Sequence, residues 1–202
     1  MGKSSEKKVA PTKDVHKIFL QAIKGQSYEN QYRFILQTGL RIGEMTGLKW
    51  KDVNFETRII QICRSMKYYY STEEWRIGEP KMGYRTVPLT EEAITILKNQ
   101  REKNKRISDI PEEWQEFVFL CRNGTPVKDS EYNALLFKIC DKAQISRFSM
   151  HILRDTFVTR CTEAGMKPKI LQILLGYNLH AHCTEEEKRE EINRVEKALM
   201  LI

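Results

Sequence analysis

The sequence has no apolar run long enough to span a bilayer, which argues against a membrane-spanning protein. Residues 1–8 also lack the apolar centre of a secretory signal, and we expect residues 1–11 to form a disordered lead-in. No internal repeat and no low-complexity tract is visible, which argues against solenoid architectures. These absences together favour an ordinary globular protein that is not bound to a membrane.

Cysteine is present but shows no pattern. The five cysteines are odd in number and widely scattered, and none forms a C-x-x-C pair. Neither a disulfide framework nor a zinc knuckle is therefore indicated, and a reducing cytoplasm is the expected compartment. The stretch His180-x-His182-Cys183 offers metal-ligand types, but no second ligand pair accompanies it, so we predict no metal site.

What the chain does contain is apolar residues for a core and an excess of positive charge. Of the 202 residues, 41% are hydrophobic, and 34 Lys and Arg face 27 Asp and Glu, for a formal charge of +7. Acidic residues cluster over 185–191, so the rest of the chain is more basic than this total. The balance favours a polyanionic partner, although many basic proteins bind no nucleic acid.

Apolar periodicity and capping residues predict a mainly α protein with a small antiparallel β-sheet. One alternating strand is expected over 57–66, and a hairpin over 77–89 with a tight turn near Gly83 that places Lys81 at the rim of the sheet. Phe117 to Leu120 reads as a short apolar strand or buried segment. The expected helices cover 12–23, 29–37, a new start after Gly39, 90–105 capped by Thr90, 130–143 capped by Ser130, 151 to a stop at Gly165, 168–175 begun by Pro168, and 184–202 opened by the capping box Thr184-x-x-Glu187.

One pair of residues organises the search for a site. His151 and Arg154 are three residues apart at the start of a predicted helix, so their side chains leave the same face. Two groups that can both be cationic make a poor structural pair, but they suit an anion placed between them. Arg41 follows Gly39 at the first turn of another helix, where backbone N–H groups already favour an anion.

Three motifs, which follow one another in the family's order, resemble the catalytic domain of a tyrosine recombinase (phage integrase family). Their residues are most similar to those of the integrases of conjugative transposons. They are T-G-L-R-I-G-E-M-T-G-L-K-W-K-D-V from Thr38, R-T-V-P-L from Arg85 and H-I-L-R-D-T-F-V-T-R from His151. The resemblance covers residues 12–176. It implies a recombinase catalytic domain over 12–183 and a C-terminal helix over 184–202 that docks on a neighbouring subunit. The family's N-terminal core-binding domain is expected to be absent from this sequence.

The resemblance also implies residue roles. Arg41 and Arg154 match the two family arginines that clamp the scissile phosphate and neutralise its growing charge. His151 matches the general acid/base histidine. Lys81 matches the hairpin lysine that protonates the departing 5′-oxygen, with Lys67 as the alternative because the turn after Lys81 is short. Glu44 matches an acidic residue that supports the first arginine.

The segment after Gly176 departs from the family pattern. Tyr177 stands where the family has His or Trp, and a phenol there can still donate a hydrogen bond. His180 stands where the family has its nucleophilic tyrosine, and the segment between Gly176 and His180 is several residues shorter than in the family. Three explanations stay open: a deletion, a segment left out of the sequence, or Tyr177 itself acting as nucleophile.

The function implied by the resemblance is site-specific DNA recombination through a 3′-phosphotyrosyl intermediate, which integrates or excises a mobile element. The implied partners are double-stranded DNA and three further copies in a tetramer on DNA, and no membrane. Because the phosphotyrosyl bond stores the energy of the broken linkage and arginines replace metal ions, no cofactor is expected. Two alternatives are a non-catalytic DNA-binding module of the same fold and an oligomerisation or regulatory domain that binds DNA only weakly.

Overall fold

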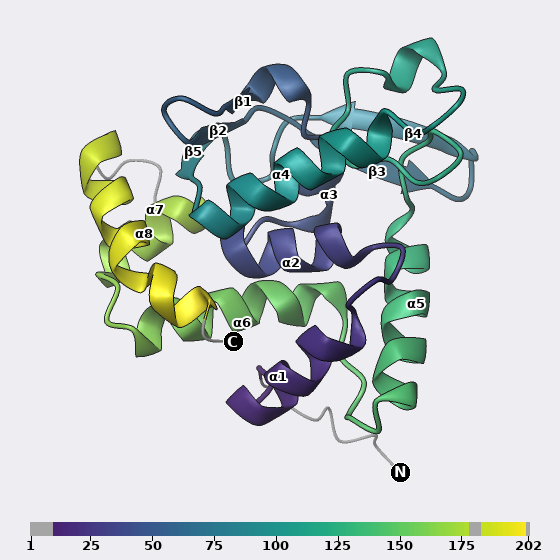
Figure 1. Cartoon of the computed structure of the whole chain (residues 1–202). Coiled ribbons are helices and arrows are strands. Elements are labelled where there is room, and N and C mark those ends of the chain that lie inside the picture. Colours follow the sequence, from purple (N-terminus) through teal and green to yellow (C-terminus); the bar gives the residue numbers. More distant parts are fainter. Residues whose placement is uncertain (1–9, 178–182, 201–202) are drawn as a thin grey trace.

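The computed structural model describes residues 10–177 and 183–200, and it consists mainly of helices with two small antiparallel sheets at the upper side of Figure 1. This confirms the predicted mainly α fold class with little β structure. The helices are α1 (Lys13–Ala22), α2 (Glu29–Thr38), α3 (Ile42–Thr46), α4 (Glu91–Asn104), α5 (Asp129–Lys142), α6 (Met150–Glu163), α7 (Pro168–Leu175) and α8 (Glu185–Met200), with short 3-10 turns at Trp50–Asp52 and Glu112–Trp114. The strands are β1 (Val53–Asn54), β2 (Ile59–Ile62), β3 (Ser65–Tyr69), β4 (Glu74–Gly78) and β5 (Arg85–Pro88).

The sheets pair differently from the prediction. One sheet has the strand order β1-β2-β5, and the other pairs β3 with β4 across the turn that follows Tyr69. The predicted hairpin over 77–89 is therefore wrong, because Ile77 pairs with Met66 of β3, whereas Val87 pairs with Ile60 of β2. The chain between β4 and β5 crosses from one sheet to the other, so Lys81 lies on a connecting loop.

The helix limits confirm several capping predictions. Thr90, the predicted cap of α4, accepts a hydrogen bond from the backbone N–H of Ala93. Thr12 caps α1 in the same way, although no cap was predicted there. Pro168 occupies the first turn of α7. The cap predicted at Ser130 is wrong, because α5 begins one residue earlier and the hydroxyl of Ser130 pairs instead with that of Tyr70.

Helix α2 lies at the centre of the main core, with α4 above it and α6 below it in Figure 1. Eight of its ten residues are buried, including Tyr32, Phe34 and Ile35, each with no exposed surface. A buried helix of this kind holds the loop at its C-terminal end in one position, because neighbouring elements pack on every side of it.

The C-terminal helix α8 packs on its own chain. Ile192, Val195 and Leu199, the apolar stripe seen in the sequence, are buried against residues of α6 and α7 such as Phe157 and Leu174. Polar contacts continue this attachment: the Glu191 carboxylate accepts a hydrogen bond from the backbone N–H of Lys167 at the start of α7 (2.9 Å). Within one copy, the apolar stripe is therefore already covered.

None of the helices in residues 10–177 and 183–200 combines the length and the apolar character needed to cross a bilayer.

Candidate active site

The junction between α2 and α3 positions Arg41. Gly39 ends α2 in the left-handed region (φ 63°), and a Cβ there would lie 2.4 Å from the ring of Phe157 on α6. Only glycine meets both conditions, because other residues rarely adopt this conformation and none fits the space. Arg41 then becomes the N-cap of α3, and its side chain is partly exposed (25%).

Arg154 reaches the same place from α6. It is 2% exposed, donates from Nη1 to the carbonyl oxygen of Gly39, and donates from Nη2 to that of Leu175 (3.1 Å). The side chain thus links the end of α2 to the end of α7. Two backbone acceptors fix the plane of the guanidinium, because the donors of arginine form a rigid fork.

Glu44 collects a second set of contacts one turn into α3. Its carboxylate accepts the backbone N–H of Arg41 (3.0 Å) and lies 3.4 Å from Nη1 of the same residue. On its other side it accepts two hydrogen bonds from Arg85 of β5, at 3.0 and 2.8 Å. Both side chains of this ion pair are buried, with 1% and 3% of their surface exposed.

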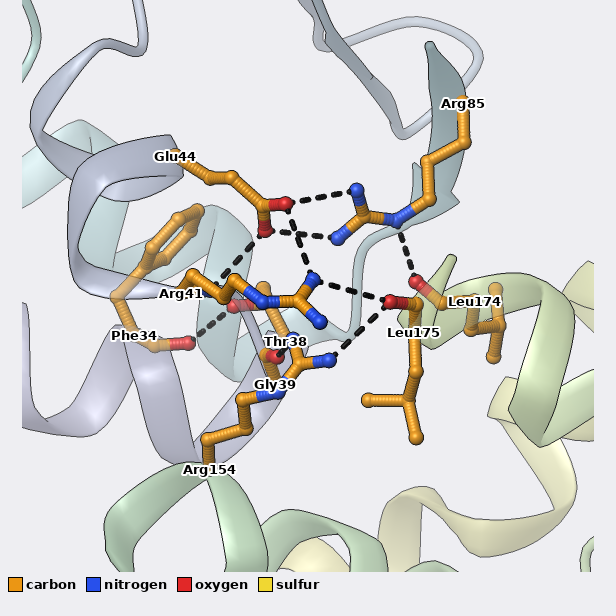
Figure 2. A network of polar contacts seen from close by, with 9 residues as sticks. All are labelled: Phe34, Thr38, Gly39, Arg41, Glu44, Arg85, Arg154, Leu174 and Leu175. Carbon is orange, nitrogen blue, oxygen red and sulfur yellow. Dashed lines mark hydrogen bonds and ion pairs between the residues drawn. The ribbon is translucent and has the colours of Figure 1, made fainter. Parts of the chain in front are cut away.

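All three arginines meet at the C-terminal end of α7 (Figure 2). The Leu175 carbonyl oxygen accepts from Arg41 (3.4 Å) and Arg154 (3.1 Å), while that of Leu174 accepts from Nε of Arg85 (2.7 Å). Carbonyl groups at a helix C-terminus lack intrahelical partners and carry partial negative charge, so cations are favoured there. We call Arg41, Arg85, Arg154 and Glu44 the arginine cluster.

Gly176 closes α7 in the left-handed region (φ 85°), and Tyr177 follows it at the surface. The Tyr177 ring centroid lies 5.6 Å from the guanidinium carbon of Arg41 and 5.8 Å from that of Arg154. The residue is 58% exposed. Its ring therefore lies beside both guanidinium groups and is open to solvent.

The charges of the cluster shift each other's pKa values. Burial by itself raises the pKa of Glu44, but the hydrogen bonds and charge of Arg85, followed by those of Arg41, hold it below the ordinary value. Burial and the neighbouring charge of Arg41 lower the pKa of Arg154. The cluster holds three guanidinium groups and one carboxylate, which contacts Arg41 and Arg85, so it carries excess positive charge and favours an anion.

The other predicted site residues lie around this cluster. Lys81 is exposed on the β4–β5 loop, and the next residue, Met82, packs so closely on Gly176 that a Cβ on this glycine would lie 2.7 Å from the Met82 Cβ. His151 stands one turn before Arg154 on α6, with a 71% exposed side chain whose Nε2 is 3.8 Å from Asp155. The structure therefore gathers Arg41, Glu44, Arg154 and Tyr177 directly, and it leaves the side chains of Lys81 and His151 open to solvent.

Three further predictions concern other positions. Lys67, the alternative to Lys81, belongs to β3 in the second sheet, with its Nζ 5.6 Å from the ring centroid of Tyr69. His180, at the expected nucleophile position, and His182 of the zinc alternative lie outside the described residues. In the part of the chain that the structure does describe, no group of three His, Cys, Asp or Glu side chains is arranged to hold a metal ion.

Arg85 is the member of the cluster that sequence reasoning missed. A signal for it exists, because Arg85 opens a strand in which Val87, two residues on, is fully buried, and alternate strand residues share a face. An arginine on the buried face of a strand requires a partner charge, and the carboxylate of Glu44 fills that requirement.

Comparison with known proteins agrees with the resemblance read from the motifs. The chain is 30% identical over 216 aligned residues to the transposase of transposon Tn916 from Enterococcus faecalis, covering 95% of this chain and 52% of that protein. It is 26% identical to a XerC-like tyrosine recombinase of Caldanaerobacter subterraneus, over 85% of this chain and 50% of that protein. The chain thus spans about half the length of these relatives.

Solved structures give the same fold. The Tn1549 transposon integrase in complex with transposon right end DNA superposes with a TM-score of 0.77 at 29% identity, covering 96% of this chain and 68% of that one. The XerA recombinase has the same fold at 21% identity, with a TM-score of 0.67 over 92% of this chain and 64% of that one. The sequence model of the phage integrase family matches residues 10–184, so this chain belongs to that family, the tyrosine recombinases.

Proposed function

We propose that the chain is the catalytic part of a site-specific recombinase, which cleaves and rejoins duplex DNA through a 3′-phosphotyrosyl intermediate to move a mobile element. The observation that carries the proposal is the convergence of Arg41 and Arg154 on one acceptor, the carbonyl of Leu175, beneath an exposed tyrosine. Guanidinium groups fixed in advance stabilise a phosphate as it gains charge, and they need not reorganise during the reaction. The integrase of Tn1549 was solved with transposon DNA, which supports DNA as the substrate here.

Each residue then has a proposed role. Arg41 and Arg154 hold the scissile phosphate, and Glu44 supports Arg41. His151 exchanges protons with the attacking or leaving oxygen, and the exposure of its side chain leaves it free to contact a substrate. Lys81 protonates the departing 5′-oxygen from a loop that packs beside the end of α7. Tyr177 donates a hydrogen bond to the phosphate or attacks it.

A non-cleaving phosphate-binding module is the second candidate, because the nucleophile is not accounted for. His180 occupies the position where the family resemblance expects tyrosine. The alignment with the Tn916 transposase also runs over 216 residues, more than the 202 of this chain, so the relative has positions that this chain lacks. These observations favour loss of cleavage with retention of DNA binding.

A covalent trap distinguishes the two candidates. The full chain is incubated with a library of nicked duplexes of random sequence. The nick lies a few nucleotides to the 3′ side of the break, so the short fragment that carries the new 5′-hydroxyl dissociates and the strand cannot rejoin. A recombinase accumulates an adduct that survives denaturation, and this should form equally in EDTA because no metal takes part in the proposed step. If no adduct forms while DNA binding falls steeply with salt, the chain is the non-cleaving module.

The same trap assigns the nucleophile. If Tyr177 attacks, Tyr177→Phe should abolish the adduct, and mass spectrometry of the wild-type adduct should place the phosphate on Tyr177. Tyr84→Phe is the matched control, because Tyr84 is a similarly exposed tyrosine (60%) hydrogen-bonded to Glu79. An adduct that persists in Tyr177→Phe would leave Tyr177 only the hydrogen-bonding role.

The assembled state is part of this proposal. We expect a tetramer on DNA, acting in the cytoplasm where the DNA is, with α8 exchanged between neighbouring copies. Exchange requires α8 to leave the apolar groove that Ile192, Val195 and Leu199 occupy within one copy. Light scattering of the chain with and without duplex DNA tests this, and a monomer on DNA would exclude the tetramer.

A further inference from the structure

Arg85 lies deep in the arginine cluster, and all three nitrogens of its guanidinium have partners. Its side chain is 3% exposed. Nη1 and Nη2 donate to the two oxygens of Glu44 at 3.0 and 2.8 Å, and Nε donates to the carbonyl oxygen of Leu174 at 2.7 Å. Because each nitrogen donates to Glu44 or to the end of α7 and the side chain is buried, Arg85 is bound to the protein itself rather than open to a substrate.

The two groups that Arg85 holds are the two supports of Arg41. Glu44 accepts the backbone N–H of Arg41 at 3.0 Å and approaches Nη1 at 3.4 Å. Leu174 is followed by Leu175, whose carbonyl oxygen accepts Nη1 of Arg41 at 3.4 Å. The single guanidinium of Arg85 therefore joins α3 to the C-terminal end of α7.

We propose that Arg85 is a positioning residue, which holds Glu44 and the end of α7 so that the Arg41 guanidinium is held ready for a phosphodiester. The inference rests on the proposed function, since it assigns how the phosphate-binding arginine is kept in place. This role needs a planar fork of donors, because lysine supplies the same charge but cannot make two parallel bonds to Glu44 and a third to Leu174.

A plain structural ion pair is the competing explanation, and the two differ in what a lysine does. If Arg85 only neutralises a buried carboxylate, Arg85→Lys keeps the charge and should leave phosphate binding unchanged. If Arg85 positions Arg41, Arg85→Lys should weaken phosphate binding even where the protein stays folded. Residues that orient a binding group from behind typically change affinity by about ten- to a hundred-fold at metal sites, and we expect the lower end of that range here.

Arg64 provides the matched control. It pairs with Asp52, a carboxylate with 6% exposure, through Nη1 and Nη2, and it also donates to the backbone carbonyl of Gly47 (3.2 Å). This is the same combination of a buried carboxylate and a helix-end carbonyl, but its partners are neither Glu44 nor the end of α7. The Arg64 side chain is 17% exposed, so Arg64→Lys reports the general cost of shortening a largely buried, carboxylate-paired arginine.

The test is a titration of the 202-residue chain with inorganic phosphate, followed by the NMR signals of the arginine Nε–H groups. In the wild-type chain, the Arg41 and Arg154 signals should shift with one dissociation constant. We expect Arg85→Lys to raise that constant about tenfold, and Arg64→Lys to leave it within about twofold at a similar loss of thermal stability. An unchanged constant in Arg85→Lys overturns the positioning role, whereas a wild-type chain with no response overturns the proposed phosphate site itself.

A second measurement needs no variant and covers the case in which Arg85→Lys does not fold. The wild-type chain is titrated with acid while the Glu44 carboxyl carbon and the Nε–H signals of Arg41 and Arg85 are followed. Positioning through Glu44 requires both arginine signals to change with the midpoint of the Glu44 carboxyl. An Arg41 signal that ignores this midpoint would overturn the inference.

Discussion

The arginine cluster and the two exposed residues beside it, Lys81 and His151, form contrasting parts of one proposed site. The side chains of Glu44 and Arg85 are 1% and 3% exposed, and Arg154 as a whole residue is 2% exposed. By contrast, the His151 side chain is 71% exposed, and Lys81 lies on a surface loop. Groups that bind charge are held by the fold before any substrate arrives, which reduces reorganisation. In the proposed function, Lys81 and His151 exchange protons with the reacting oxygens, and their exposure leaves them free to do so. Mutations in the buried cluster should therefore lower the free energy of unfolding, whereas mutations of Lys81 and His151 should leave it nearly unchanged and slow the proposed cleavage.

The largest effect is expected for Arg154→Ala. The change removes a buried guanidinium, which takes away the side-chain donor of the Gly39 carbonyl and one of the two side-chain donors of the Leu175 carbonyl. We expect a loss of about 3–5 kcal/mol in the free energy of unfolding, together with loss of phosphate binding. Urea unfolding measures the first and the phosphate titration the second. Unchanged stability would mean that the cluster is not held as the structure describes.

Glu44→Gln should have the next largest effect. It leaves the charge of Arg85 buried without a counter-charge, for a cost of about 2–4 kcal/mol in the free energy of unfolding. Glu116→Gln is the control, because the Glu116 side chain is 57% exposed and its contact with Lys49 is at the surface. Equal losses in the two variants would contradict the distinction between buried and exposed charges.

Acid should destabilise the chain in two successive pH windows. Burial, then the charges of Arg160 and Arg33, lower the pKa of His16 to about 3, so the unfolded chain binds a proton first as pH falls below 6.5. Stability should then decline by up to about 1.4 kcal/mol per pH unit. Glu44, whose folded pKa is depressed, adds a loss only below its unfolded value near 4.5.

Chemical unfolding at a series of pH values measures this decline. His16→Leu should flatten the curve between pH 6.5 and 4.5 and leave the steeper loss at lower pH. A curve in His16→Leu that matches the wild type over the upper window would show that another group causes the decline.

The smallest effect on stability is expected for Lys81→Ala, with a change within about 0.5 kcal/mol because the side chain is exposed. In a chain that forms the covalent adduct, the same change should slow cleavage, and a substrate with a 5′-thiol leaving group should restore it because that group needs no proton. If the thiol substrate gives no rescue, Lys67→Ala is the next variant to assay.

Much of the fold follows from short-range rules. The breaks at Gly39 and Gly176, the Thr12 and Thr90 caps and the start of α7 at Pro168 can all be predicted, because each depends on the conformational limits of a residue and its immediate neighbours. The partner strands of β4 and β5 cannot be predicted in this way, because a strand pairs with one of several strands that are distant in the chain. The alternation of apolar residues suits a pairing of Ile77 with Val87 as well as the observed pairings of Ile77 with Met66 and of Val87 with Ile60.

The candidate site divides in the same way. The motifs around Arg41 and Arg154 identify the arginines that we propose bind the phosphate, and one helical turn relates His151 to Arg154. The partners of Arg85 emerge only in three dimensions, because Glu44, β5 and the end of α7 are far apart in the chain and are brought together by the fold (Figure 2).

By itself, the sequence determined where most of the helices begin and end, which arginines to propose for a phosphate, and that the charge balance suits a polyanion. Tertiary structure alone decided that β4 pairs with β3, that α8 covers its own chain, and that three arginines meet at the end of one helix. The physical reason is the range of the forces. Backbone sterics and capping act within a few residues, whereas burial and charge pairing depend on which distant surfaces the folded chain brings into contact.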